Sequence, residues 1–289
     1  MFKLKRTAAF VLSLAMTAAL LSGCGDKENS SSDKTSGSDG KSSAQQSSGK
    51  LMNFTPPEEG EEIIVMTIKD YGDVKIKLFP EQAEKGVENF TGLAEKGYYD
   101  GLIFHRVINN FMIQGGDPEG TGMGGESLWG GKFDGGTSPD LTHAAGAVAY
   151  ANSGGTSTDG SQFYIVTGET YDEDTLTSLT EYYKITLSDE AKEIYTTIGG
   201  TPWLDGSYTI FGQVFDGLDI VFDIQGVSTD SNDKPEKDVV IEKISVEKYD
   251  GGDVKFYMSD YKYYIKLYMK ILFCFYTGIR IISPEQTII

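Results

Sequence analysis

The chain has 289 residues, of which 39% are hydrophobic and 24% charged, a composition typical of one large globular domain or two small ones. Its formal net charge of −18 disfavours binding to nucleic acid or to an anionic membrane surface, because both need a positive face. Two cysteines and two histidines are too few for a disulfide framework, a four-ligand zinc site or a histidine-rich metal site. We therefore expect an acidic, soluble domain without a metal.

The first 23 residues have the pattern of an export signal. Basic residues at positions 3, 5 and 6 precede an apolar run that ends at Leu21-Ser22-Gly23-Cys24. Small residues directly before such a cysteine resemble the lipobox of bacterial lipoproteins, in which the cysteine is diacylated and retained as the first residue. The resemblance implies lipidation of Cys24 and a protein anchored on the extracytoplasmic face of the cell membrane. The alternative is a plain secretory signal with a chance cysteine.

Residues 24–59 have the composition of a linker. From Gly25 to about Pro57 they are mainly Ser, Gly, Lys, Asp and Gln, with almost no apolar side chains. Such a segment cannot bury enough surface to offset the entropy of ordering. We expect a disordered tether that holds a domain, residues 60–249, clear of the membrane.

The domain opens with a hairpin pattern followed by a helix. Residues 63–68 lead into a turn at 70–73, and residues 74–78 alternate apolar with polar side chains. A helix is predicted from Pro80 to Gly97, with apolar residues at helical spacing between them.

Short strands separated by glycine-rich turns follow. They are predicted at residues 146–151, 162–166, 209–215 and 239–246, and this pattern with few helices indicates a closed antiparallel β-barrel.

Residues 171–200 interrupt the strands with a helical insertion. The segment begins acidic, and Ser188 has the position of an N-cap for a helix whose apolar face is Ala191, Ile194, Tyr195 and Ile198. Two glycines at 199 and 200 end it.

After Tyr249 the composition changes abruptly to Tyr, Lys, Ile and Phe. Lys266, Lys270 and Arg280 interrupt the apolar pattern, which disfavours a membrane-spanning helix. Residues 250–289 are predicted to be an atypical extension outside the domain; the alternative is an extra strand or helix packed on it.

Conventional catalytic motifs are weak in this chain. Residues Gly120 to Gly125 satisfy G-x-G-x-x-G, but no strand before them or helix after them is evident, so we interpret them as a series of tight turns. His105 and His143 could each serve a nucleophile, yet the domain has no cysteine and no obviously placed serine. A hydrogen-bonded structural role is favoured for both histidines.

The segment from Phe104 to Asp117 concentrates unusual residues around a single cation, Arg106. If it is a strand, alternation places Met112 and Gln114 beside Arg106 and Phe111 on the other face. A bend near residues 109–110 would bring Phe111 to the side of the arginine. The alternative interpretation is an arginine that is ion-paired at the rim of a barrel.

Several segments, in order along the chain, resemble the signature of the cyclophilins, the peptidyl-prolyl cis-trans isomerases. They are Phe104-His-Arg with Phe111-Met-Ile-Gln-Gly-Gly-Asp117, Gly120-Thr-Gly with Gly125, Ala151-Asn152, Gly160-Ser-Gln-Phe-Tyr-Ile165, and Trp203-Leu-Asp-Gly206 with Phe211-Gly212. The similarity covers about residues 62–249. It implies a mainly β fold, a closed eight-stranded antiparallel β-barrel capped by two helices, here with the helical insertion added.

Position by position, the resemblance assigns the catalytic role to Arg106. It implies that the proline pocket and the surrounding groove are formed by His105, Phe111, Met112, Gln114, Ala151, Asn152, Gln162, Tyr164, Trp203, Leu204 and Tyr208. Tyr208 stands where eukaryotic members usually have histidine, and Tyr164 where phenylalanine is common, so cyclosporin-like ligands are only a candidate partner. The insertion is expected to narrow or extend the groove.

The predicted function is acceleration of cis/trans isomerisation of X-Pro bonds in exported proteins, which assists their folding and needs no cofactor. Its partners would be proline-containing segments, and the membrane through the lipid on Cys24. The alternatives are a non-catalytic, proline-binding or chaperone-like lipoprotein, and a structural lipoprotein that only spaces components of the envelope.

Overall fold

A computed structural model describes residues 50–255 of the chain. The predictions about the signal peptide, Cys24, most of the linker and most of the C-terminal extension concern residues outside that range. Among the residues it covers, no helix has both the length and the apolarity needed to cross a membrane.

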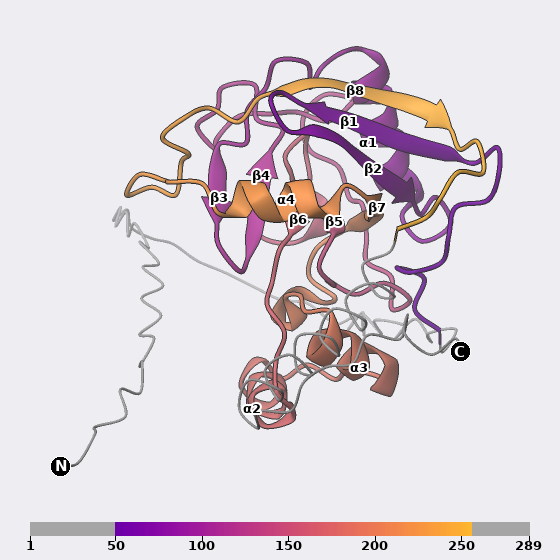
Figure 1. The fold of residues 1–289 in the computed structure, drawn as a ribbon, viewed down its shortest axis with the longest axis vertical. Coiled ribbons are helices and arrows are strands. Elements are labelled where there is room, and N and C mark those ends of the chain that lie inside the picture. Colours follow the sequence, from indigo (N-terminus) through magenta and orange to yellow (C-terminus); the bar gives the residue numbers. More distant parts are fainter. Residues whose placement is uncertain (1–49, 256–289) are drawn as a thin grey trace, which may run out of the picture. The chain divides into compact units, whose positions relative to one another are not determined.

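The described chain forms eight strands, four α-helices and two short 3-10 helices (Figure 1). In chain order these are β1 (Glu62–Ile68), β2 (Gly72–Leu78), α1 (Glu84–Glu95), β3 (Arg106–Ile108), β4 (Met112–Gly115), β5 (Ala147–Tyr150), η1 (Thr156–Thr158), β6 (Phe163–Val166), α2 (Glu173–Tyr183), α3 (Asp189–Thr197), η2 (Pro202–Leu204), β7 (Ile210–Asp216), α4 (Leu218–Gln225) and β8 (Ile241–Lys248).

All eight strands belong to one antiparallel sheet, in the order β3-β4-β6-β5-β7-β2-β1-β8. The predicted hairpin is confirmed, since β1 pairs with β2 from Ile63 opposite Lys77 to Ile68 opposite Gly72. The four later strands lie where the glycine-separated segments were predicted, within one or two residues at each end.

The mainly β, eight-stranded antiparallel class is confirmed, but a closed barrel is not observed. The sheet curls, and its end strands β3 and β8 form no ladder with each other among the described residues. Only an isolated bridge between Ile103 and Val240, with a few backbone hydrogen bonds such as Phe104 N to Val239 O (3.0 Å), joins the two ends. Strand β3 has three residues, and all three pair with β4.

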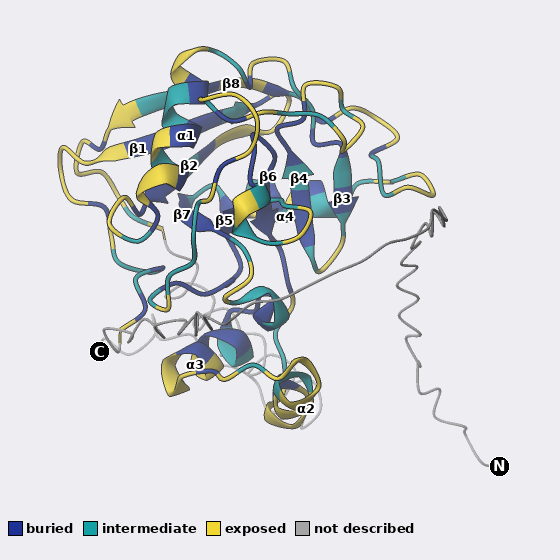
Figure 2. Ribbon diagram, turned by 180° about the vertical axis from the view of Figure 1, so that it is seen from behind, coloured by how far each residue is buried: buried dark blue, intermediate teal, exposed yellow. Residues whose placement is uncertain are grey.

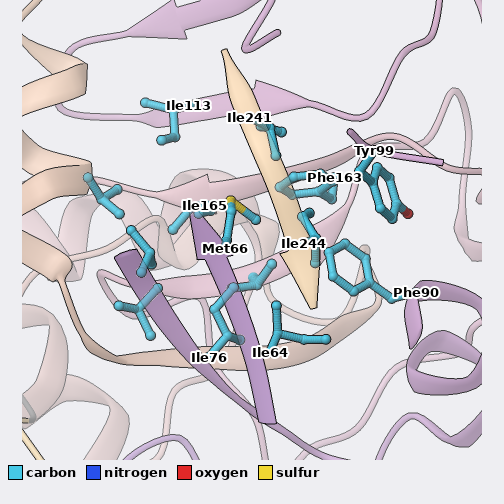
Figure 3. Close-up of a cluster of buried hydrophobic side chains, with 14 of the residues drawn as sticks. Ile64, Met66, Ile76, Phe90, Tyr99, Ile113, Phe163, Ile165, Ile241 and Ile244 are labelled. Atoms are coloured by element: carbon cyan, nitrogen blue, oxygen red, sulfur yellow. The ribbon is translucent and has the colours of Figure 1, made fainter. Parts of the chain in front are cut away.

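The inner face of the curled sheet holds the main hydrophobic core. Ile64, Met66, Ile76, Ile165 and Ile244 point into it from four strands (Figure 3). Aromatic rings fill the same space, with Phe90 of α1 stacked on Tyr99 at 4.9 Å and edge-to-face with Phe163 at 5.2 Å between ring centroids. Such a core fixes the curvature of the sheet, because side chains from its two ends meet in it.

Helices α1 and α4 lie at opposite ends of the curled sheet, and both pack into the main core, through Phe90 and Leu93 of α1 and through Val221 and Ile224 of α4 (Figures 1 and 2). Helix α1 begins at Glu84, later than the predicted start at Pro80, because residues 80–83 form turns on Phe79, whose carbonyl accepts from the amides of Gln82 and Ala83. Its end is as predicted, since Gly97 has a φ of 67°. Helix α4 was missed by the sequence analysis.

The predicted insertion contains two helices. Ser188 caps α3, because its side chain accepts a hydrogen bond from the amide of Ala191 (3.1 Å), as predicted. Helix α2 was not resolved from the sequence as a separate element, although Asp172 caps it in the same way through Thr175 N (2.7 Å). Both helices turn exposed faces outward (Figure 2) and bury Leu176, Ala191 and Ile194 in a second, smaller core that also includes Leu51, Ala144 and Ala145.

Part of the predicted linker is packed structure. Asn53 is buried, and its side-chain nitrogen donates to Thr142 O and Gln213 Oε1, both at 2.9 Å. Leu51 is buried against the insertion. The predicted domain start at residue 60 therefore leaves out side chains that the fold buries, because a few apolar and amide groups in a polar segment give no periodic signal.

Candidate active site

One row of side chains crosses four strands on the face of the sheet that points away from the main core. Arg106 of β3 is paired with Gln114 of β4, Gln114 with Tyr164 of β6, and Tyr164 with Ala149 of β5. Directly opposed residues share a face, so strand register alone brings the arginine, the amide and the tyrosine together. The neighbouring row, which includes Ile113 and Ile165, points into the main core.

The turn between β3 and β4 brings Phe111 to the same side. Asn110 has a φ of 57°, in the left-handed region, and the amide of Phe111 donates to Ile108 O at 3.2 Å. The bend considered near residues 109–110 is therefore present, and it overrides the alternation that would have separated Phe111 from Arg106.

These strand residues form one wall of a cavity of about 190 Å³. We call Arg106, Phe111, Met112, Gln114 and Tyr164 the strand wall. Across the cavity lie Leu204 and Tyr208, on the segment 201–209 that leads from the insertion into β7; we call this pair the loop wall. Ala151 and Asn152 complete the lining at the end of β5.

Amide groups line the polar side of the cavity. Gln114 Nε2 donates to Gln162 Oε1 at 2.9 Å, and Gln162 Nε2 in turn donates to Gly124 O at 2.8 Å. The backbone of Ala151 is held to Gln162 O by a hydrogen bond of 2.9 Å from its amide. Two side-chain amides in a fixed chain suit a groove that binds the backbone of a polypeptide.

Arg106 lies at the rim, with 43% of its side chain exposed. Its Nε is 3.5 Å from Asp233 Oδ2, and the Asp233 side chain is 44% exposed. An exposed pair of this kind adds little to stability but restricts where the arginine points. It uses one donor, whereas a guanidinium carries four more N–H groups on its two Nη atoms.

The loop wall is anchored by the carboxylate of Asp205, the residue directly after Leu204. Asp205 Oδ2 accepts from Thr142 Oγ1 and Tyr195 OH, both at 2.7 Å. Asp205 Oδ1 accepts from the amide and the Nδ1 of His143, both at 2.8 Å. Because a carboxylate can only accept, His143 carries its proton on Nδ1. Tyr195 belongs to α3, so the insertion takes part in holding the pocket.

A second anchor holds the other end of the same segment. Thr209, which follows Tyr208, donates through Oγ1 to Asp159 Oδ2 at 2.6 Å. Burial raises the pKa of Asp159 to about 6, against an ordinary value of 3.8, although the hydrogen bond from Thr209 opposes the rise.

Behind the cavity, the ring of His143 stacks on that of Tyr164, with 6.1 Å between centroids and 12° between planes. Tyr164 is buried, and its hydroxyl has no hydrogen-bond partner among the described residues. Burial raises the pKa of this hydroxyl well above its usual value, so it stays protonated.

Nine of the predicted site residues line the cavity: Arg106, Phe111, Met112, Gln114, Ala151, Asn152, Tyr164, Leu204 and Tyr208. Gln162 joins them through its bond to Gln114, and Trp203 through Phe111, whose ring it faces at 6.1 Å.

His105 is not part of the cavity lining. It is buried beside Gly122, and neither ring nitrogen has a hydrogen-bond partner within residues 50–255. Burial lowers its pKa, which keeps the ring neutral. The expected hydrogen-bonded role therefore holds for His143 but not for His105. His105 lies away from the cavity because it is adjacent to Arg106, and adjacent residues of an extended chain point to opposite sides.

The glycine series at residues 120–125 forms turns, as predicted. Gly120, Gly122 and Gly125 have φ values of 63°, 82° and 94°, and the carboxylate of Asp117 accepts from Glu119 N, Thr121 N and Gly122 N. Within the described residues, no group of three or more His, Cys, Asp or Glu side chains could hold a metal ion.

The roles of Asp205 and Asp159 as anchors were not predicted from the sequence. Asp205 belongs to the Trp203–Gly206 motif, but the motif does not indicate which residues bond to its carboxylate.

The described chain matches a family model for "Cyclophilin type peptidyl-prolyl cis-trans isomerase/CLD" over residues 63–246. A protein of Staphylococcus aureus strain COL, named as a peptidyl-prolyl cis-trans isomerase, is 48% identical over 187 residues, which are 65% of this chain and 93% of the relative. A Staphylococcus haemolyticus protein named in the same way is 46% identical over 186 residues, covering 64% and 92% of the two chains.

Two solved structures of a Cryptosporidium parvum cyclophilin type peptidyl-prolyl cis-trans isomerase share the fold. The one determined in the presence of the dipeptide Ala-Pro is 31% identical with a TM-score of 0.51, and the other is 32% identical with a TM-score of 0.52. Both comparisons cover 65% of this chain and 99% of the other.

Proposed function

Because this chain belongs to the family of cyclophilin-type peptidyl-prolyl cis-trans isomerases, we propose that its cavity binds the proline ring and that Arg106 is the catalytic residue. The observation that supports this assignment is the position of one cation at the rim of a cavity that has an apolar side and an amide-lined side. Phe111, Met112, Tyr164, Leu204 and Tyr208 provide the apolar lining.

The reaction requires rotation about an amide bond rather than bond cleavage. The barrier of about 18–20 kcal/mol arises from amide resonance, which is lost as the C–N bond twists. A catalyst must therefore bind the twisted amide more tightly than either planar form. A pocket that holds the pyrrolidine ring while amide groups hold the flanking backbone allows this difference, and no nucleophile, metal or cofactor is needed.

Arg106 is suited to the twisted state. As resonance is lost, the prolyl nitrogen gains a lone pair that can accept a hydrogen bond from a guanidinium N–H. Arginine stays charged, and its donors are fixed in one plane, so little reorganisation accompanies the reaction. Gln114, Gln162, Ala151 and Asn152 provide donors and acceptors for the backbone on the polar side of the cavity.

The cellular setting is a further part of the proposal. If the signal and Cys24 act as their sequences predict, the substrates are proteins that fold outside the cytoplasm, where slow prolyl isomerisation limits folding. A binding or chaperone-like lipoprotein is the alternative function, but a binder has no need for a cation beside the bond that rotates.

The test is a peptide isomerisation assay on the wild-type protein and on Arg106→Ala. We expect wild-type catalysis and a loss of about 10²–10³-fold in kcat/KM for the variant, the scale for removal of one stabilising donor from a transition state. Its unfolding midpoint should stay unchanged, since the Arg106 side chain is only half-buried and its exposed ion pair adds little.

Two results would contradict the assignment. Unchanged kcat/KM in Arg106→Ala would remove the arginine from the mechanism. Peptide binding without any catalysis by the wild type would favour the alternative, binding function. Loss of membrane association in Cys24→Ala, measured by cell fractionation, separately tests the lipid anchor.

A further inference from the structure

Four aromatic side chains form a continuous series from the cavity to the surface of the insertion. Phe111 lines the cavity and faces Trp203 at 6.1 Å between centroids and 29° between planes. Trp203 faces Tyr183 of α2 at 6.0 Å and 27°, and Tyr183 meets Tyr182 edge-on at 4.9 Å. We call these four residues the aromatic ladder.

The outer end of the ladder is exposed. Tyr182 and Tyr183 are 78% and 38% exposed, and they are two of the five large hydrophobic side chains exposed in the described residues. Phe111 and Trp203 are each partly buried. Exposed aromatic side chains that continue from a binding pocket are typical of an interaction surface rather than of a core.

We propose that the aromatic ladder is an extension of the substrate groove that binds a large apolar or aromatic side chain a few residues away from the proline. The inference rests on the proposed function of the cavity. The ladder binds a segment of the same polypeptide whose proline lies in the cavity, because the ladder starts at a cavity residue.

The distances fit such a segment. The two ring spacings of 6.1 and 6.0 Å place Tyr183 at most about 12 Å from Phe111. An extended chain advances about 3.3–3.6 Å per residue, so a side chain two to four residues from the proline reaches the ladder.

Ring chemistry restricts the occupant further. Glu181 directly precedes the two tyrosines and Lys184 directly follows them, so their charges offset each other at the outer end of the ladder. An aromatic residue in the substrate would add ring contacts to the ladder. The ladder therefore selects for aromatic residues near the proline.

The test uses the full protein and an alanine host peptide with one central proline. Phe or Asp is placed singly at each of the four positions on either side, and kcat and KM are measured by NMR exchange. For the wild type we expect Phe to raise kcat/KM about 2–10-fold at one or more positions, mainly by lowering KM. Asp at those positions should give no such increase in kcat/KM.

Tyr183→Ala should abolish the preference for Phe while leaving kcat/KM for the alanine host unchanged, which also shows that the variant is folded. Tyr183→Phe should retain the preference, because it keeps the ring. Tyr71→Ala is the matched control, since Tyr71 is 37% exposed but lies on the turn between β1 and β2.

The proposal is overturned if the wild type shows no preference for Phe at any position, or if Tyr183→Ala shows the wild-type profile. Failure of the proposed function would look different, because the wild type would not accelerate even the alanine host. In that case calorimetric binding of the same peptides still tests the ladder, through the same comparison of Tyr183→Ala with Tyr71→Ala.

Discussion

The two walls of the cavity are built by different means. The strand wall takes its geometry from the register of β3, β4 and β6, in which Arg106, Gln114 and Tyr164 are direct cross-strand partners. The loop wall belongs to an irregular segment. It is held in place by the hydrogen bonds that Asp205 accepts from Thr142 and Tyr195 and by the one that Thr209 donates to Asp159. One wall is positioned by backbone pairing, and the other by buried polar groups.

This difference indicates where the site is vulnerable. Ladder bonds are shared among many residues, so a single substitution in the strand wall changes chemistry without moving the wall. The loop wall depends on a few charge-assisted bonds, so a single substitution at an anchor should affect both stability and substrate binding. Two aspartates, Asp205 behind the loop wall and Asp233 beside Arg106, allow the same substitution to be compared at both places.

The largest effect is expected for Asp205→Ala. The variant would leave the two donors of His143 without their acceptor, and would leave the hydroxyls of Thr142 and Tyr195 only the contact that they make with each other, which should lower the free energy of unfolding by about 2–4 kcal/mol. Displacement of Leu204 and Tyr208 should lower kcat/KM about tenfold or more under conditions where the protein is folded. Urea unfolding and the peptide assay measure the two effects.

Asp205→Asn is the matched control, because it keeps the size of the side chain and one acceptor oxygen. Its decreases in the free energy of unfolding and in kcat/KM should both be smaller than those of Asp205→Ala. If Asp205→Ala is as stable as the wild type, the loop wall is held by something other than this carboxylate.

The second expected effect concerns the other anchor and depends on pH. Asp159 binds a proton more tightly in the folded state, where its pKa is about 6, than at its ordinary value of 3.8. Its contribution to stability is therefore fully present below about pH 4 and is lost as the pH rises through about 6.

Asp159→Asn removes that titration. The difference in free energy of unfolding between Asp159→Asn and the wild type should shift in favour of the variant by about 1–3 kcal/mol as the pH rises from 4 to 7.5. Urea unfolding of both proteins across this range measures the difference, in which carboxylates common to the two chains cancel. A difference that stays constant with pH would show that Asp159 titrates normally.

The smallest effect is expected for Asp233→Ala. Its ion pair with Arg106 is solvated on both sides, but Asp233 has a left-handed φ of 63° that alanine tolerates less well than aspartate, so the free energy of unfolding should fall by about 1 kcal/mol. Freer motion of the guanidinium should lower kcat about 2–5-fold with little change in KM. A loss of stability equal to that of Asp205→Ala would contradict the contrast between the two walls.

Local patterns were sufficient for much of this protein. Alternation predicted the β1–β2 hairpin, and the capping serine with its apolar spacing predicted α3. The resemblance to cyclophilins supplied the list of site residues, most of which meet around one cavity. These signals succeed because each is carried by residues within a few positions of one another.

Short or weakly periodic elements were not predictable in the same way. Helix α4 has only eight residues, and α2 buries only Leu176, so neither gives a strong helical period. The absence of a ladder between β3 and β8 depends on how strands far apart in the chain meet, which no local pattern encodes.

By itself, the sequence determined the class of fold, the candidate catalytic arginine and the existence of an insertion. Only the tertiary structure decided that Phe111 turns toward Arg106, that Asp205 joins Thr142 and His143 to Tyr195, and that an aromatic series links the cavity to α2. Apart from the local turn that carries Phe111, these contacts join residues that are ten or more positions apart, and their formation depends on the packing of the whole fold, which a local sequence pattern does not encode.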